Sequence, residues 1–228
     1  MGLIDESAFV IDLDDTLFAE TDYQQSGFRA VAQVVRDLFG IEVEQLLLCW
    51  HARGDPDVFG SLAAHLGLPP TAKESFLWND RLHRRSITLG ESVASALDDV
   101  RRACAGIAIL TDGRAITQRR KLAARGLGDI EAFISEKWVR AFSPDGRRFE
   151  EIMRRHPGCR FVYVADNPAK DFQAPNRLGW TTIGVFNGRR VACNSASADD
   201  LPAHWVGEFA DISSLLAVGA TARWEGRP

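Results

Sequence analysis

Three carboxylates follow a short apolar stretch near the start of the chain. Phe9 to Ile11 are apolar, and Asp12, Asp14 and Asp15 come directly after them. Such a run is typical of a buried parallel strand, and chemistry in open α/β sheets gathers outside the carboxyl ends of the strands. The sequence thus predicts Asp12 and Asp14 at a strand end, where a divalent cation could hold them together. An Asp-rich turn is the alternative interpretation.

A hydroxyl and a glycine follow a second apolar stretch. Residues 106–111 are expected to form a strand that ends at Thr111, and Asp112 and Gly113 lead from it into a helix. The threonine can donate its hydroxyl, the glycine lets the backbone approach closely, and a helix N-terminus favours an anion. This pattern predicts a phosphate site, although Thr or Asp as an N-cap would also explain it.

Two further aspartates come after a third apolar stretch. Residues 160–165 are expected to form a strand, and Asp166 and Asp171 follow it. Parallel strands bring their carboxyl ends to the same edge of a sheet, so these carboxylates are expected beside Asp12. An Asp-Asn-Pro turn would account for the same residues.

These three segments, in this order, resemble motifs one, two and four of the haloacid dehalogenase (HAD) superfamily. The matching strings are Asp-Leu-Asp-Asp-Thr-Leu from Asp12, Leu-Thr-Asp-Gly around Thr111, and Asp-Asn-Pro-x-x-Asp from Asp166. Most members of this superfamily hydrolyse phosphoesters through an aspartyl-phosphate. The resemblance implies that Asp12 is the nucleophile and that Asp14 is the general acid and base.

The resemblance also implies ligands for metal and phosphate. Magnesium would be held by Asp12, Asp166 and the backbone carbonyl of Asp14, while Asp171 would orient a ligand or bind the metal secondarily. The phosphoryl oxygens would be bound by Thr111 and by amides near Asp112 and Gly113. The implied partner is a small phosphorylated metabolite, which the sequence does not name.

The chain departs from the resemblance at motif three. Ser143 stands where members of this type carry a lysine that neutralises the nucleophile and the bound phosphate. Losing a charge aimed at the transition state costs roughly a hundred- to a thousand-fold in rate. Lys137 and Arg140 are expected as the replacements that bind phosphate, and Arg147 and Lys170 are further candidates.

Other functions within the resemblance stay open. A catalytically impaired HAD-like module that binds a ligand or partner would explain Ser143. Phosphomutases share the same residues. Carbon–halogen hydrolysis is less favoured, because those dehalogenases lack the second aspartate, which is Asp14 here.

The order of predicted elements indicates an α/β fold with a Rossmann-like parallel sheet and helices on both faces. Helices and strands are predicted to alternate regularly after residue 91. One of these helices is predicted over 169–178, and residues 187–207 are predicted to form a loop. Residues 19–87 are predicted to be an all-helical cap inserted into a core of residues 1–18 and 88–228. Such a cap is expected to select the substrate.

Composition excludes several classes of protein. The chain has 228 residues and a net charge of −4, which gives no electrostatic footprint for nucleic acid. Its four cysteines lack metal spacing. No signal peptide or membrane-spanning stretch is recognisable, so a cytoplasmic protein, monomeric or homodimeric, is expected.

Overall fold

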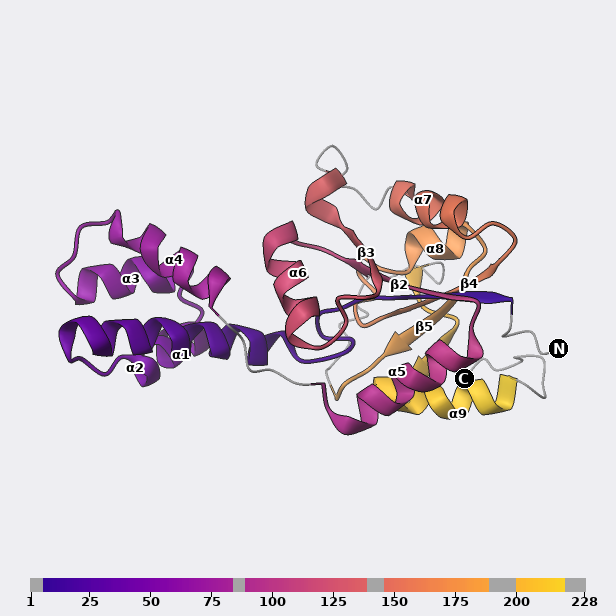
Figure 1. Ribbon diagram of the computed structural model, residues 1–228, viewed down its shortest axis with the longest axis horizontal. Coiled ribbons are helices and arrows are strands. Elements are labelled where there is room, and N and C mark those ends of the chain that lie inside the picture. Colours follow the sequence, from indigo (N-terminus) through magenta and orange to yellow (C-terminus); the bar gives the residue numbers. More distant parts are fainter. Residues whose placement is uncertain (1–5, 84–88, 139–145, 189–199, 220–228) are drawn as a thin grey trace. The chain divides into compact units, whose positions relative to one another are not determined.

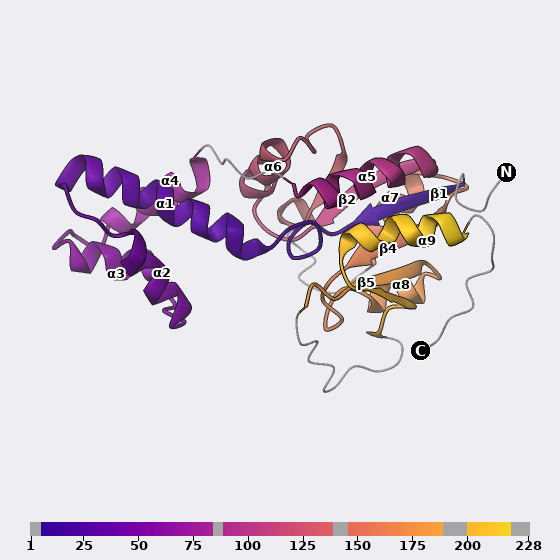
Figure 2. The same ribbon diagram turned by 90° about the horizontal axis from the view of Figure 1, so that it is seen from below.

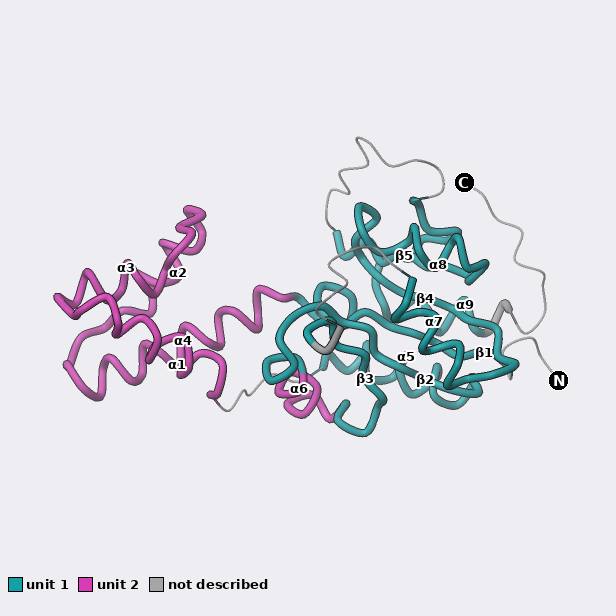
Figure 3. The backbone as a smooth tube through the Cα atoms, turned by 90° about the horizontal axis from the view of Figure 1, so that it is seen from above, with its two compact units in different colours: residues 1–19, 89–118, 127–228 teal, residues 20–88, 119–126 magenta. Residues whose placement is uncertain are grey.

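The computed structural model describes residues 6–83, 89–138, 146–188 and 200–219. Figure 3 shows the two compact units into which the chain divides. The first unit comprises residues 1–19, 89–118 and 127–228, and the second comprises residues 20–88 and 119–126. The sequence analysis assigned residues 119–126 to the core, whereas in the structure they group with the second unit.

The first unit is built on a parallel sheet of six strands, which gives the chain an α/β, Rossmann-like fold. The strands are β1 (Ser7–Ile11), β2 (Gly106–Thr111), β3 (Glu131–Ile134), β4 (Arg160–Ala165), β5 (Thr181–Val185) and β6 (His204–Val206). Their order is β3-β2-β1-β4-β5-β6, so β1 lies between β2 and β4. Ile11 pairs with Ile109 on one side and with Val164 on the other. This register brings the carboxyl ends of the three strands to one edge.

Helices cover both faces of this sheet. They are α5 (Glu91–Ala103), α7 (Arg147–Arg155), α8 (Gln173–Arg177) and α9 (Ile212–Gly219), with short 3-10 helices η1 (Ser135–Trp138) and η3 (Phe209–Asp211). Helix α6 (Ala115–Ala124) begins in this unit, and its end belongs to the second unit. Figures 1 and 2 show α7 and α8 on one face and α5 and α9 on the other. The predicted layering of the sheet between helices is confirmed.

Two predicted elements need correction. The loop predicted over 187–207 contains the edge strand β6. The helix predicted over 169–178 forms only as α8, because the residues before it make a turn. In that turn the backbone N–H groups of Lys170 and Asp171 donate to the carbonyl of Asn167, at 3.2 and 3.0 Å.

Side chains that alternate along the strands form a hydrophobic core on the face of the sheet covered by α7. Ala8 and Val10 of β1 point to this face, where aromatic side chains from three other elements gather. Phe161 stacks on Trp180, with ring centroids 4.5 Å apart, and the ring of Phe149 meets the same Trp180 edge-on at 5.1 Å. Offset and edge-on pairs of this kind add to the free energy gained from burial. The core thus fixes the strands whose ends form the candidate site.

The second unit is helical and has its own core. Its helices are α1 (Glu20–Phe39), α2 (Glu44–Ala52), α3 (Val58–His65) and α4 (Ala72–Leu82), together with the end of α6. Phe28, Val31 and Val35 form the buried stripe of α1, as their helical spacing predicts. Leu38 and Phe39 share that spacing but are exposed at the end of the helix. Among the described residues, no helix combines the length and apolar character needed to cross a membrane.

Candidate active site

The loop after β1 presents the first carboxylates of the site. Asp12 follows the last residue of the strand, and its backbone N–H donates to the carbonyl of Val164 in β4 at 2.9 Å. The Asp12 residue is 7% exposed. The Thr16 hydroxyl lies 3.4 Å from Asp12 Oδ2, and Asp15 adopts a left-handed conformation with φ 60°. The chain therefore turns sharply just after Asp12, which keeps Asp14 at the same end of the strand.

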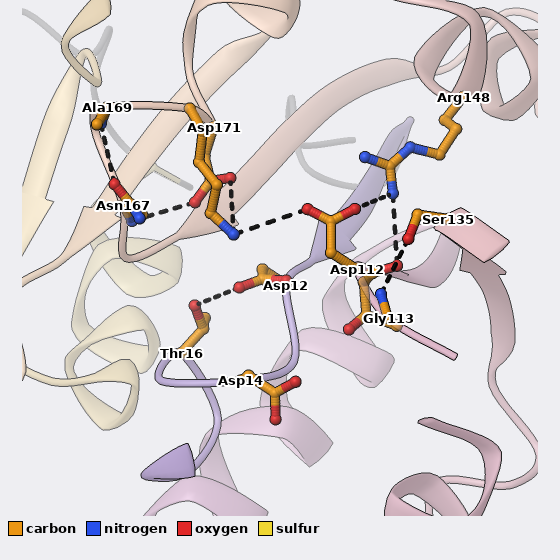
Figure 4. A network of polar contacts seen from close by, with 12 residues as sticks. Asp12, Asp14, Thr16, Asp112, Gly113, Ser135, Arg148, Asn167, Ala169 and Asp171 are labelled. Atoms are coloured by element: carbon orange, nitrogen blue, oxygen red, sulfur yellow. Dashed lines mark hydrogen bonds and ion pairs between the residues drawn. The ribbon is translucent and has the colours of Figure 1, made fainter. Parts of the chain in front are cut away.

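Three carboxylates meet at this edge of the sheet. Asp12, Asp166 and Asp171 each offer an oxygen, and the three oxygens lie within 4.8 Å of one another. The backbone N–H of Asn167 donates to Asp171 Oδ2 at 3.1 Å, while the Asn167 side chain accepts from the N–H of Ala169 (Figure 4). Asp171, expected to orient a ligand or to bind the metal secondarily, has its carboxylate within the group itself.

Burial and mutual repulsion shape the electrostatics of this group. Burial raises the pKa of Asp12 well above 3.8, and the Asp171 carboxylate raises it further, while the Lys170 ammonium lowers it. Burial also raises the pKa of Asp171 to about 7, against the opposing effect of Lys170. Carboxylates this close favour a proton or a cation between them. Their hard oxygen donors are of the kind that Mg²⁺ prefers, so the residues fit the predicted metal.

Asp14 is held by a residue that the sequence analysis did not single out. Gln118, on α6, donates from Nε2 to Asp14 Oδ2 at 2.8 Å and also contacts Thr111 Oγ1 at 2.9 Å. It further donates to the backbone carbonyl of Asp112. Gln118 is 2% exposed, and its Oε1 is buried without a hydrogen-bond partner among the described residues. One amide group therefore joins the loops after β1 and β2.

The predicted phosphate segment is closely packed in the structure. The N–H of Gly113 donates to the Ser135 hydroxyl at 2.9 Å, so a phosphoryl oxygen that accepted this N–H would have to displace that hydroxyl. Glu136 accepts the N–H of Ala115 at the start of α6, at 2.6 Å. The buried Thr111 hydroxyl is an acceptor for Gln118, which leaves its own hydrogen available to a ligand.

Cations border the same segment. Arg148, on α7, forms an ion pair with Asp112 (Figure 4). Its Nη1 lies 2.9 Å from Asp112 Oδ1 and 3.4 Å from the carbonyl oxygen of Thr111. Lys170 Nζ lies 3.7 Å from Asp112 Oδ2. Of the replacements expected for the motif-three lysine, Arg140 lies outside the described residues, as does the side chain of Lys137.

The structure thus brings the predicted carboxylates and Thr111 to one edge and adds Gln118, Ser135 and Arg148. Ser143 lies outside the described residues. Gln118 and Arg148 lie on helices, and Ser135 lies directly after β3. Their residue types alone do not indicate that their side chains face the site. The available signal was weak: Gln118 lies seven positions after Thr111, near the start of the helix that follows the phosphate segment.

Comparison with known proteins identifies the fold. No protein-family model matches the chain, and no curated protein matches it. Solved structures do: a candidate β-phosphoglucomutase from Thermotoga maritima has a TM-score of 0.66 at 15% identity, over 93% of this chain and 99% of its own. The candidate HAD hydrolase YfnB from Bacillus subtilis, bound to magnesium, gives 0.62 at 14% identity, over 93% and 99%. A 2-haloacid dehalogenase from Pseudomonas syringae gives 0.60 at 18% identity, over 93% and 98%.

These matches extend over nearly the whole length of each chain. At such identities the likeness defines the fold alone. The chain has the fold of the HAD superfamily, a Rossmann-like parallel sheet, and the carboxylates of the candidate site lie at the carboxyl ends of its strands.

Proposed function

We propose that the protein is a magnesium-dependent phosphoester hydrolase that acts on a small phosphorylated metabolite. The observation that carries the proposal is the grouping of the buried Asp12 carboxylate with those of Asp166 and Asp171. The second carboxylate of the same loop, Asp14, is held by Gln118 rather than drawn into that group. Two carboxylates in different environments suit two different tasks, attack and proton transfer.

Asp12 and Asp14 then divide the reaction between them. In the first step a carboxylate oxygen of Asp12 bonds to phosphorus, and the bond from phosphorus to the ester oxygen breaks. Asp14, protonated, gives its proton to the departing oxygen. In the second step Asp14 takes a proton from water, the water oxygen bonds to phosphorus, and the bond to Asp12 breaks. Inorganic phosphate leaves, and both side chains return to their starting state.

Metal and phosphate ligands support this chemistry. Asp12, Asp166 and Asp171 would hold the magnesium ion, with the backbone carbonyl of Asp14 as a further predicted ligand. When bound, the ion supplies positive charge that offsets the repulsion between carboxylate and phosphate. Thr111 donates its hydroxyl to a phosphoryl oxygen, from a position set by its contact with Gln118.

Carbon–halogen hydrolysis is the second candidate, since several matching structures are haloacid dehalogenases. That reaction would use Asp12 in the same way, but a leaving halide needs no proton. The hydrogen bond that holds Asp14 in place favours phosphoester chemistry, in which an acid for the leaving oxygen lowers the barrier.

Phosphate release from a panel of small phosphomonoesters tests the proposal. We expect release by the wild type with magnesium and none with EDTA. Asp12→Asn should lower the rate at least about a thousand-fold, because the nucleophile is lost. Asp129→Asn, at a surface ion pair with Arg101, is the matched control and should keep the wild-type rate.

The same panel discriminates the alternatives. Phosphate release that survives in Asp12→Asn would contradict the proposed nucleophile. Halide release from 2-chloropropionate without phosphate release would favour the dehalogenase. If neither product forms and magnesium does not raise the melting temperature, a HAD-like binding module becomes the better account.

A further inference from the structure

Lys170 connects two loops of the candidate site. It precedes Asp171 in the turn after β4, and its Nζ lies 3.9 Å from Asp171 Oδ1. The same Nζ lies 3.7 Å from Asp112 Oδ2, in the loop after β2. Because β1 lies between β2 and β4 in the sheet, the ammonium group spans the strand that ends at Asp12. Figure 4 draws both contacts as dashed lines, with Asp12 below Asp112 and Asp171 in the view.

The ammonium group of Lys170 forms ion pairs with both carboxylates but lies beyond hydrogen-bond distance of each. Both distances exceed the length of an N–H···O hydrogen bond, about 2.7–3.2 Å, so the three donors of Lys170 are not spent on these two contacts. Asp112 already has a closer partner in Arg148, at 2.9 Å. Lys170 also interacts electrostatically with Asp12. Its side chain is 50% exposed, so a ligand can reach it from solvent.

The chemistry at this edge requires such a cation. Attack by an anionic carboxylate on an anionic phosphoester gathers negative charge at the reacting atoms. The acidic side chains of Asp112, Asp166 and Asp171 add to that charge, and Asp112 belongs to the predicted phosphate segment itself. A positive group aimed at the developing charge in a preorganised site is worth roughly a hundred- to a thousand-fold in rate.

We infer that Lys170 is a catalytic residue that binds the transferred phosphoryl group beside Asp12, so that the loop after β4 supplies the cation that Ser143 cannot supply. This inference rests on the proposed function. The Nζ–H groups donate to phosphoryl oxygens, and the contacts with Asp112 and Asp171 hold the side chain across the site before substrate arrives.

Five proteins test this inference: the wild type, Lys170→Met, Lys170→Ala, Lys170→Arg and the control Lys73→Met, which removes a lysine paired with Asp57 in the helical unit. Rates of p-nitrophenyl phosphate hydrolysis are measured over a magnesium titration. We expect Lys170→Met to lower kcat about a hundred- to a thousand-fold at saturating magnesium. Lys170→Arg should recover part of that loss, and Lys73→Met should match the wild type. Added ethylammonium should raise the rate of Lys170→Ala and leave the wild type unchanged.

The outcomes separate this inference from the proposed function. If the wild type hydrolyses the ester and Lys170→Met keeps its kcat, the inference is wrong while the proposed function stands. A loss in Lys170→Met that excess magnesium fully restores would also overturn it, because the lysine would then act only on metal binding. No hydrolysis by the wild type of any phosphoester would overturn the proposed function and the inference with it.

Discussion

The raised pKa of Asp171 is expected to make the free energy of unfolding depend on pH. Burial and the neighbouring Asp166 carboxylate raise its pKa to about 7 in the folded protein, from 3.8. The folded state thus binds this proton more tightly than the unfolded chain does. Between about pH 4 and pH 7 the unfolded chain releases the proton first, so raising the pH through this window costs stability.

In EDTA we therefore expect the free energy of unfolding of the wild type, relative to Asp171→Asn, to fall as the pH rises from about 4 to about 7. Asparagine keeps an oxygen for the Asn167 N–H but has no proton to lose in this range. Urea titrations of both proteins across this range measure the difference. Parallel stability curves would show that Asp171 does not titrate in this window.

Gln118 is expected to act on Asp14 rather than on the substrate. Gln118→Leu removes the donor to the Asp14 carboxylate and leaves the Asp112 carbonyl without this partner. We expect kcat to fall about 10- to 100-fold with an alkyl phosphate, whose leaving group needs a proton, and much less with p-nitrophenyl phosphate. Equal losses on both esters would indicate a purely structural role.

Single residues differ in how far sequence alone reveals them. Asp12, Thr111 and Asp166 follow apolar runs directly, so their place at strand ends can be predicted from pattern. Gln118 and Arg148 lie on helices, and their contacts depend on how α6 and α7 pack. No local pattern encodes that packing, and so these residues were missed.

At the scale of elements, the loop after β1 depends on one unusual backbone conformation. Asp15 has φ 60°, and its backbone N–H donates to the carbonyl of Phe18 at 2.7 Å. The Asn187 side chain donates to the Asp15 carbonyl. Asp and Asn tolerate the left-handed region far better than β-branched residues do. The loop that carries Asp14 is therefore sensitive to residue type at this position.

Asp15→Val should destabilise the protein by about 1–2 kcal/mol relative to Asp15→Asn, because valine strains the left-handed conformation. We also expect a lower kcat in Asp15→Val, since relaxing that strain moves Asp14. Chemical denaturation and phosphate release measure the two effects. Equal stability of the two variants would show that the loop adapts at no cost.

Elements were predicted best where a long periodic or apolar segment defines them. The strands over 106–111 and 160–165 match β2 and β4. The strand β6 was missed because three residues at a sheet edge give no periodic signal. Helix α8 was predicted too long because its first four expected residues form a turn around Asn167 instead.

At the scale of the whole molecule, alternating helices and strands predicted the parallel sheet. The pairing that puts β1 between β2 and β4 is what gathers the site, and it joins segments about 100 to 150 residues apart. The grouping of residues 119–126 with the helical unit was not predictable, because it depends on packing between distant segments. The fold thus followed from local patterns, while the details of the site depended on long-range contacts.

A phosphoryl group on Asp12 is the central claim, and trapping it is the most direct measurement. Asp14→Asn should slow the second step, in which Asp14 activates water, so the intermediate should accumulate. The variant is mixed with magnesium and p-nitrophenyl phosphate, whose leaving group needs no acid, so that the first step still proceeds. The reaction is quenched in acid and analysed by peptide mass spectrometry. We predict one phosphoryl group on the peptide that contains Asp12, lost in Asp12→Asn/Asp14→Asn. The account would be contradicted if the wild type released phosphate while the phosphoryl group was found on another residue. It would also be contradicted if single-turnover oxygen-isotope experiments showed that water attacks the substrate directly.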